Sequence, residues 1–411
     1  MVSVEAVSIS HRDSVFTSNG SLCEEWSRRR KRVLLSSTLY FPNIGGVENS
    51  IYHLGREYRK RGMRPVLLVS TGGDANATAR WFEVRRIHGL PVLRYKFSSI
   101  ALIRFLRAWM ALRVLRRKFR IMSMVARDQH SALAAVMVGQ PCVYLVPGIA
   151  AEQHRPKGLN PLRWLNHLSS VLLQRTALGR VAEVAVFSRR MAESIAATGV
   201  KRDVHRVSPG IDPSRFRPIS RSEIIEHRGA MGIAADAVVG VVVGRLARQK
   251  RLDLAIEALA VAPKNWWLLI AGDGPLRRDV EGQAERLGVG SRVVFAGSTR
   301  FPEKIMQIAD IYVLSSDNET FGQVLLEAMA CGLKIVAFDP SLSDVDTATD
   351  EIVPQDWLFT AGAKDARALQ AAMAEAVEAT RHPCEISSWA HANYSWQRLA
   401  QRLMEFATAR R

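Results

Sequence analysis

Two glutamates, Glu319 and Glu327, flank a glycine-containing turn between an apolar strand predicted at 311–314 and an apolar helix. Ligands of parallel sheets bind beyond the carboxyl ends of strands, so Glu319 is expected in a binding loop. Glu327 could accept two hydrogen bonds from a ribose diol, as acidic residues do in dinucleotide sites. The backbone amides of Thr320, Phe321 and Gly322 would lie near the start of the helix, where phosphate oxygens are favoured. The alternative is a pair of solvated glutamates on a helix.

A second group of residues carries positive charge. Gly244 and Arg245 follow a strand predicted at 238–243, and Lys250 comes five positions later. The glycine lets the backbone turn sharply, the arginine can grip two oxygens at once, and the lysine acts as a point charge. Such a group could neutralise a diphosphate whose charge grows as a bond to it breaks. The alternative is two ordinary surface cations.

Two further turns contain glycines at the ends of predicted strands. Gly45 and Gly46 follow the first strand, and their amides could meet phosphate or sugar oxygens. Gly272 and Asp273 follow a strand predicted at 266–271 and could contact the same ligand. Each turn could equally be a plain connection that only shapes its loop.

Strand-like apolar runs alternate with helical stretches in two successive blocks, which predicts two parallel sheets covered on both faces. A segment at 208–218 with three prolines and a glycine separates the blocks. We therefore expect a polar, disordered leader at 1–31, one domain at 32–212, a second at 213–386 and a single amphipathic helix at 387–411.

The 411-residue chain has a net charge of +18 that is unevenly placed. Residues 1–220 contain 36 lysines and arginines against 14 aspartates and glutamates, so this half carries +22 and the remainder −4. The asymmetry predicts an anionic partner for the first half. No apolar run reaches the roughly 18 residues of a membrane span, and no secretory signal is recognised. The four cysteines lack disulfide spacing, which favours a reducing, cytoplasmic compartment.

A basic stretch at 101–120 adds to this asymmetry. At helical spacing, one face would collect Ala101, Phe105, Ala108, Leu112, Leu115 and Phe119, with basic residues around it. Such a helix suits an anionic membrane surface, so a peripheral location at the inner face of the membrane is expected. The alternative is a core helix whose apolar face packs on the sheet while the arginines remain in solvent.

Taken together, the four motifs resemble retaining glycosyltransferase family four in their order and spacing. The resemblance implies a GT-B fold, an α/β architecture of two Rossmann-like, doubly wound domains facing across a cleft. The N-terminal domain would bind the acceptor and the C-terminal domain the nucleotide-sugar, and the last helix would pack back on the N-terminal domain. Arg245 and Lys250 would bind the donor diphosphate, Glu319 the donor sugar and Glu327 the ribose, with Gly45 and Gly46 lining the cleft. The catalytic set predicted in this way is Glu319, Arg245, Lys250 and His130, and the donor-binding set is Gly45, Gly46, Gly244, Arg245, Lys250, Gly272, Asp273, Glu319, Thr320, Phe321, Gly322 and Glu327.

The chain departs from the family pattern in two places. Pro147 and Gly148 stand where members often have a histidine, which leaves His130 or His154 as alternatives. The segment 340–344 replaces a glycine-rich loop. Asp344 at the end of this segment and Asp346 form a D-x-D string, which holds a divalent metal in other transferases. A three-residue match is expected by chance, and we predict no metal.

The expected activity is transfer of a sugar from a nucleoside-diphosphate sugar, UDP first and GDP second, to a hydroxyl with retention. The expected setting is cell-surface polysaccharide, lipopolysaccharide or glycolipid synthesis. The donor is a co-substrate and no cofactor is expected, while the acceptor would be a glycan or a lipid-linked molecule. Alternatives are a sugar-nucleotide epimerase, a nucleic-acid-binding protein and a non-catalytic GT-B subunit. Nucleic acid is not expected as a partner, because no recognisable binding module is present.

Overall fold

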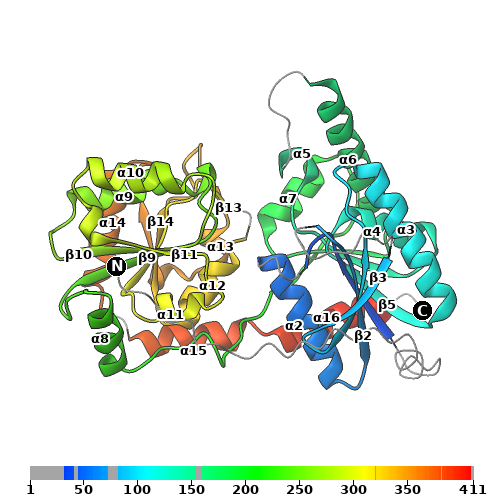
Figure 1. The fold of residues 1–411 in the computed structure, drawn as a ribbon, viewed down its shortest axis with the longest axis horizontal. Coiled ribbons are helices and arrows are strands. Elements are labelled where there is room, and N and C mark those ends of the chain that lie inside the picture. The colour runs from blue at the N-terminus through cyan, green and yellow to red at the C-terminus, as the bar shows by residue number, and fades with distance from the viewer. Residues whose placement is uncertain are drawn as a thin grey trace.

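The computed structural model describes residues 32–40, 45–72, 82–153, 160–319, 321–380 and 382–408. Two lobes lie side by side, each built on a central sheet with helices on both faces (Figure 1). The leader expected at 1–31 lies outside the described residues, as do Thr320 and His154. The two doubly wound domains predicted for the chain are confirmed.

The first domain contains an eight-stranded sheet in the order β3-β4-β2-β1-β5-β6-β7-β8. All neighbouring pairs are parallel except β3 and β4, an antiparallel edge hairpin that was not predicted from the sequence. The central strands are buried along nearly their whole length, as expected for a parallel sheet covered on both faces. The strands are β1 Arg32–Ser37, β2 Arg64–Ser70, β3 Phe82–Ile87, β4 Leu90–Tyr95, β5 Ile121–Ala126, β6 Cys142–Leu145, β7 Glu183–Val186 and β8 His205–Arg206. The helices are α2 Gly46–Lys60, α3 Ala101–Lys118, α4 Gln129–Met137, α5 Ala150–Gln153, α6 Pro161–Arg180 and α7 Arg189–Ala197.

The second domain contains a six-stranded parallel sheet in the order β11-β10-β9-β12-β14-β16. Its strands are β9 Val238–Val243, β10 Trp266–Ala271, β11 Val293–Gly297, β12 Ile311–Leu314, β14 Lys334–Phe338 and β16 Leu358–Ala361. Beside this sheet, β13 Asn318–Glu319 pairs in parallel with β15 Asp346–Thr347. The helices are α8 Arg221–Ala230, α9 Leu252–Val261, α10 Arg277–Arg286, α11 Pro302–Met306, α12 Gln323–Ala330, α13 Thr349–Ile352 and α14 Ala366–Glu378, with short 3-10 turns η1 Arg248–Lys250, η2 Gly290–Arg292 and η3 Gln355–Trp357.

The C-terminal segment forms two helices, α15 Pro383–Asn393 and α16 Trp396–Thr408, so the single helix predicted at 387–411 is wrong. The chain is extended at Tyr394 and Ser395, where the Tyr394 carbonyl accepts a hydrogen bond from the Ile211 amide at 3.4 Å and Ser395 bridges to Ile211. A contact with a residue so distant in sequence interrupts the helix although its apolar periodicity continues. The break lets α15 pack on α12 of the second domain and α16 on α2 of the first (Figure 1).

The chain therefore crosses between the domains twice, and the two crossings touch. Gly210 packs so tightly on Trp396 that a Cβ atom at position 210 would lie 2.1 Å from the Trp396 amide nitrogen. The indole of Trp396 in turn stacks on His53 of α2, with ring centroids 4.9 Å apart and planes 5° from parallel. The hinge, by which we mean the two touching crossings at Gly210 and Trp396, is thus packed against the first domain.

Helix α3 covers the predicted basic stretch, and its orientation corrects one interpretation. Ala101, Ala108, Leu112 and Leu115 are buried inside the domain. The face first assigned to a membrane surface is thus a core face, which is the alternative considered above. Within the part of the chain that the structure describes, no helix is long and apolar enough to cross a bilayer.

Replacing Gly210 tests the tight crossing. Gly210→Ala is expected to lower the free energy of unfolding by about 2 kcal/mol or more, because the added methyl group would overlap the Trp396 backbone. Thermal denaturation measures this loss. Gly362→Ala is the matched control, since a Cβ atom there meets nothing within 4 Å. Equal stability of the two variants would contradict this account of the hinge.

Candidate active site

An ion pair joins Lys250 of η1 to Glu319 of β13, so two residues predicted for the site do meet. The loop around each residue is tied to the other. The Ser315 hydroxyl donates to the Lys250 carbonyl at 2.7 Å, and the Asp317 amide donates to the Gln249 carbonyl at 3.1 Å. Lys250 and Glu319 are therefore held together at the carboxyl ends of β9 and β12.

The turns after β9 and β10 lie backbone against backbone. A Cβ atom on Gly272 would fall 1.8 Å from the Gly244 carbonyl oxygen, and one on Gly274 would fall 2.3 Å from the Leu246 carbonyl oxygen. Gly244 and Gly272 also have positive φ angles of 151° and 147°. Asp273 is exposed, and its carboxylate accepts a hydrogen bond from the Gly274 amide at 2.7 Å. The turn at Gly272 and Asp273 therefore shapes its loop, which is one of the two roles that the sequence left open for it.

Arg245 lies at the rim of these turns. Its side chain is exposed and forms no hydrogen bond or ion pair with any residue that the structure describes. The side chain of its neighbour Leu246 is buried, which anchors the loop beside it. The guanidinium group of Arg245 is thus accessible to a ligand anion.

Glu327 projects from the middle of α12 and is half-buried. Burial raises the pKa of its carboxyl group to about 8, with nearby Arg215 lowering it and Glu303 raising it. Arg215 and Glu303 form a two-point ion pair, with N–O distances of 3.2 and 2.6 Å. The Glu327 carboxyl group therefore keeps its proton to a higher pH than an exposed glutamate does.

Two helix N-termini meet at the junction of the domains. Gly45 and Gly46 begin α2, and Gly322, with φ 71°, begins α12. A Cβ atom on Gly46 would lie 3.8 Å from Cβ of Gln323, the first residue of α12. Among the described residues, neither helix is capped by a side chain of its N-cap residue. The Glu48 carboxylate interacts with its own backbone amide in the first turn of α2, and the remaining amides at the two helix starts are suited to an anion between them.

Aromatic and charged side chains of the first domain reach the same junction. The ring of Phe187 lies 5.2 Å from the ring of Phe321 in the second domain, and the Arg127 guanidinium lies 4.9 Å above the Phe187 ring. Arg127 is buried, which lowers its pKa to about 10, although Tyr144 and Glu48 favour its charged form. Burial likewise raises the pKa of Glu48. Arg127 and Glu48 were missed in the sequence, although each directly follows a strand or a glycine turn.

His130 occupies a different position from the one expected of a catalytic group. It is 1 % exposed within α4, and its Nδ1 atom lies 3.5 Å from the Asp128 carboxylate. A side chain so enclosed cannot touch a substrate in the cleft, so its position contradicts the predicted catalytic role. The residue that follows β5 and reaches the junction is Arg127.

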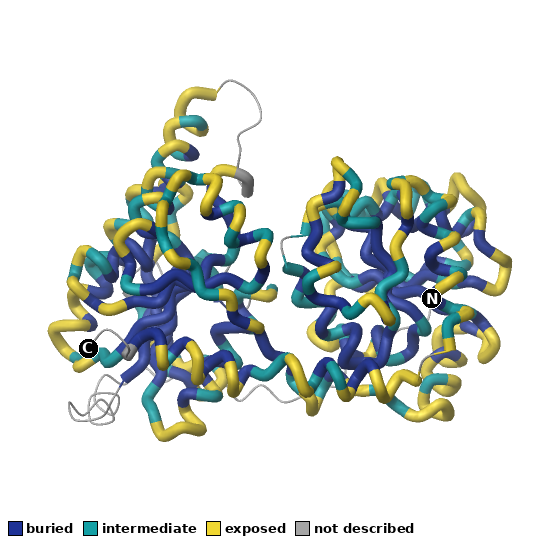
Figure 2. Tube along the Cα trace, turned by 180° about the vertical axis from the view of Figure 1, so that it is seen from behind, coloured by how far each residue is buried: buried dark blue, intermediate teal, exposed yellow. Residues whose placement is uncertain are grey.

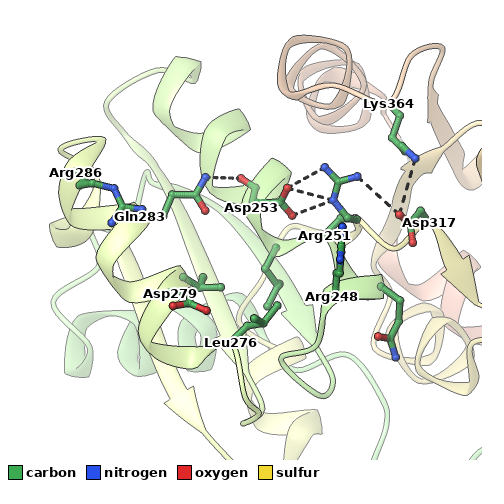
Figure 3. Close-up of a pocket in the computed structure, with 12 residues that line it drawn as sticks. Arg248, Arg251, Asp253, Leu276, Asp279, Gln283, Arg286, Asp317 and Lys364 are labelled. Atoms are coloured by element: carbon green, nitrogen blue, oxygen red, sulfur yellow. Dashed lines mark hydrogen bonds and ion pairs between the residues drawn. The ribbon is translucent and has the colours of Figure 1, made fainter. Parts of the chain in front are cut away.

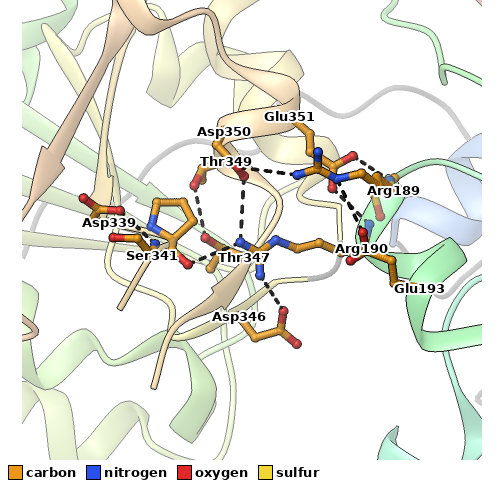
Figure 4. A network of polar contacts seen from close by, with 12 residues as sticks. Arg189, Arg190, Glu193, Asp339, Ser341, Asp346, Thr347, Thr349, Asp350 and Glu351 are labelled. Carbon is orange, nitrogen blue, oxygen red and sulfur yellow. Dashed lines mark hydrogen bonds and ion pairs between the residues drawn. The ribbon is translucent and has the colours of Figure 1, made fainter. Parts of the chain in front are cut away.

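A network of polar contacts joins the domains at the far wall of the site (Figure 4). The Glu351 carboxylate of the second domain accepts hydrogen bonds from the amides of Arg189 and Arg190, at 2.5 and 3.0 Å. It thus caps α7 of the first domain. The Arg190 guanidinium pairs with Asp346 at 3.1 Å. Because β15, which contains Asp346, pairs with β13, this contact is linked to the strand that holds Glu319.

The D-x-D string is divided between two partners. Asp344 pairs with Lys364, and Asp346 pairs with Arg190. Among the described residues, no group of three or more His, Cys, Asp or Glu side chains is arranged to hold a metal ion.

A cavity of about 950 Å³ opens on the other side of η1 (Figure 3). None of Arg245, Lys250, Glu319 and Glu327 lines it. Across its wall, Arg251 pairs with Asp253 and Asp317, and Lys364 also pairs with Asp317. Arg251 has a left-handed backbone, φ 43°, where η1 joins α9. This network ties the residue that follows Lys250 to Asp317, two residues before Glu319.

Comparison with known families agrees with the fold. A model described as Glycosyltransferase Family 4 matches residues 44–215, and one described as Glycosyl transferases group 1 matches residues 223–388. The two matches cover both domains. The chain belongs to glycosyltransferase family four and has the GT-B fold.

Individual relatives are similar over most of their length. GDP-mannose-dependent alpha-mannosyltransferase of Mycobacterium tuberculosis is 28 % identical over 320 residues, 75 % of this chain and 79 % of that protein. The phosphatidylinositol N-acetylglucosaminyltransferase GPI3 subunit of Saccharomyces cerevisiae is 25 % identical over 394 residues, 90 % of this chain and 81 % of that protein. The crystal structure of Anabaena Alr3699/HepE in complex with UDP and glucose has the same fold, with a TM-score of 0.72, 21 % identity and coverage of 92 % and 100 %.

The raised pKa of Glu327 predicts pH-dependent binding. A carboxylate accepts two hydrogen bonds from a ribose diol and a carboxylic acid only one, so nucleoside diphosphate affinity is expected to rise as pH increases through about 8. Isothermal titration calorimetry with UDP and GDP between pH 6 and pH 9 measures this. The Glu327→Gln variant should bind the nucleoside diphosphate more weakly than the parent protein at high pH, and its affinity should no longer depend on pH. The same pH dependence in the variant and the parent would contradict the role given to Glu327.

The same shift has a consequence for stability. The folded pKa lies above the ordinary value of 4.5, so ionisation of Glu327 favours the unfolded chain as pH rises from about 4.5 to about 8. Glu327→Gln should therefore gain melting temperature relative to the parent protein at pH 9 and not at pH 4. A higher melting temperature of the variant at both pH values would indicate an effect of packing instead of ionisation.

The interdomain cap on α7 predicts a loss of activity when it is removed. Glu351→Ala is expected to lower kcat/KM about tenfold, because two charge-assisted hydrogen bonds that hold the domains together are lost. Small-angle scattering should show a larger radius of gyration. Glu193→Ala removes an exposed carboxylate from α7 itself and serves as control. Unchanged activity and dimensions in Glu351→Ala would overturn the role given to this contact.

Proposed function

We propose that the protein transfers a sugar from a nucleoside-diphosphate sugar to a hydroxyl group with retention of configuration. The observation that carries the proposal is the Lys250–Glu319 ion pair beside two uncapped helix N-termini. A donor diphosphate between the domains would meet Lys250, Arg245 and the free amides of α2 and α12. Its sugar would then lie near Glu319.

These residues supply positive charge where the departing diphosphate gains negative charge. We propose that the leaving phosphate oxygen accepts the proton of the acceptor hydroxyl on the same face of the sugar. Protein side chains then position the reactants and stabilise charge, so no histidine base is required. The donor is a co-substrate, and the proposed reaction needs no bound cofactor or metal.

UDP is the first candidate nucleotide and GDP the second. The Anabaena structure contains UDP and glucose, and the mycobacterial relative is described as GDP-mannose-dependent. A lipid-linked or glycan acceptor is supported by the phosphatidylinositol-directed relative. We place the protein in the cytoplasm at the inner face of the membrane, which the unpaired state of Cys142, Cys331 and Cys384 supports.

A non-catalytic subunit is the second candidate. The yeast relative is described as a subunit, Pro147 stands where family members often have a histidine, and His130 is buried. A protein of this kind would bind a nucleotide without turning over a sugar donor.

A screen of nucleotide-sugars separates these candidates. Thermal shift identifies the donor, and release of nucleoside diphosphate with and without acceptor extracts measures turnover. Lys250→Ala and Glu319→Ala are each expected to reduce turnover about 100-fold or more. Lys264→Ala and Glu226→Ala replace exposed residues and are the controls. Binding of a donor without turnover would favour the non-catalytic candidate. Conversion of the donor into another nucleotide-sugar without acceptor would favour an epimerase. A product with inverted configuration at the anomeric carbon would exclude retention.

A further inference from the structure

Helix α6 turns a row of leucines toward solvent. Leu162, Leu165, Leu168 and Leu172 are 75, 65, 58 and 65 % exposed. Their spacing of three, three and four residues places them on one side of the helix. The start of α6 projects beyond the body of the domain, and its tube is largely in the exposed class (Figures 1 and 2). Such a contiguous apolar surface differs from the single exposed apolar residues that are common on soluble proteins.

The inward side of α6 is polar over residues 167–174, which reverses the usual arrangement of a surface helix, whereas Ala177 and Leu178 near its end are buried in the apolar core. His167, Ser170 and Gln174 are buried on this polar side. The Gln129 amide donates to the Ser170 hydroxyl at 3.0 Å, and the Gln174 amide donates to the Gly148 carbonyl at 2.8 Å. These hydrogen bonds fix the rotation of the helix, so the leucines cannot turn inward.

Helix α3 extends this surface. Asn166 of α6 accepts a hydrogen bond from the Ala101 amide at 2.7 Å and donates one to the Ser99 carbonyl at 3.0 Å, so the start of α3 lies beside α6. Leu102 and Leu106 are 52 and 43 % exposed on the outer side of α3. We call the six exposed leucines of α6 and α3 the leucine face.

Positive charge continues from the leucine face along α3. Arg113, Arg116 and Arg117 are exposed and follow Leu102 and Leu106 on the same side at helical spacing. Neither α3 nor α6 contains an aspartate or a glutamate. An apolar surface next to unopposed basic residues is complementary to a bilayer containing anionic lipid.

We propose that the leucine face inserts into the interfacial layer of an anionic membrane while the α3 arginines contact lipid phosphates. The proposal rests on the proposed function for its purpose, since it would bring a lipid-linked acceptor to the enzyme. Gln174 joins α6 to Gly148 and to the Ala150 amide, at the carboxyl end of β6. Helix α6 therefore connects the leucine face to the carboxyl end of β6.

Vesicle binding tests the proposal without any sugar donor. Co-sedimentation compares phosphatidylcholine vesicles with and without phosphatidylglycerol. The quadruple variant L162Q/L165Q/L168Q/L172Q should reduce the partition coefficient about tenfold or more. The variant R113Q/R116Q/R117Q should bind anionic vesicles more weakly and lose much of the salt dependence. A matched control, I225Q/M231Q/V261Q/L287Q, alters four residues of the second domain that are 39 to 54 % exposed and should bind as the parent does.

Two outcomes would overturn the proposal. One is an unchanged partition of the quadruple leucine variant. The other is a dimer of the parent protein in sedimentation equilibrium that the same variant converts to monomer, which would assign the leucine face to a second copy of the chain. Hydrolysis of a soluble nucleotide-sugar should be equal in the parent and the leucine variant. That readout tests the transferase proposal separately from membrane binding.

Discussion

The pairing of two chain crossings, Ile211 with Ser395, sets the relation between the domains on which the site depends. The Gln323 side chain extends this constraint by donating a hydrogen bond to the Gly210 carbonyl at 3.0 Å. The first residue of α12 is thereby tied to the hinge. The α12 N-terminus and the α2 N-terminus then face each other because both are held by the same crossing. The relative position of the two helix starts therefore follows from contacts made at the crossing.

The main chain contributes to the positive potential expected at the junction. Helix starts contribute free amides whose positions are set by folding, and Lys250 is already held by a carboxylate. Preorganised groups of this kind need little rearrangement when charge develops. The buried Arg127 adds a cation close to the junction, where it packs on the ring of Phe187, which in turn contacts Phe321.

Local patterns predicted the strands and the turns at their ends well, because apolar runs and glycines report on neighbouring residues. Glu319 and Lys250 were found together because both follow strands of one parallel sheet, and such strands end at a common edge. Long-range packing was not predictable. The break at Ser395 needs Ile211, the cap on α7 needs Glu351, and burial of His130 depends on how α4 packs in the first domain. The polar inner side of residues 167–174 in α6 likewise depends on partners in other elements.

The contact between the turns after β9 and β10 has a consequence for the adaptability of this enzyme. Gly272 has no room for a side chain beside the Gly244 carbonyl oxygen, and both glycines have positive φ angles that other residues rarely adopt, so neither position is expected to accept other residues. The side chains on the solvent side of the same turns, such as Arg245 and Asp273, are exposed and can vary without disturbing this contact. Exposed side chains on these two turns can therefore be exchanged while the main-chain contact between the turns stays the same.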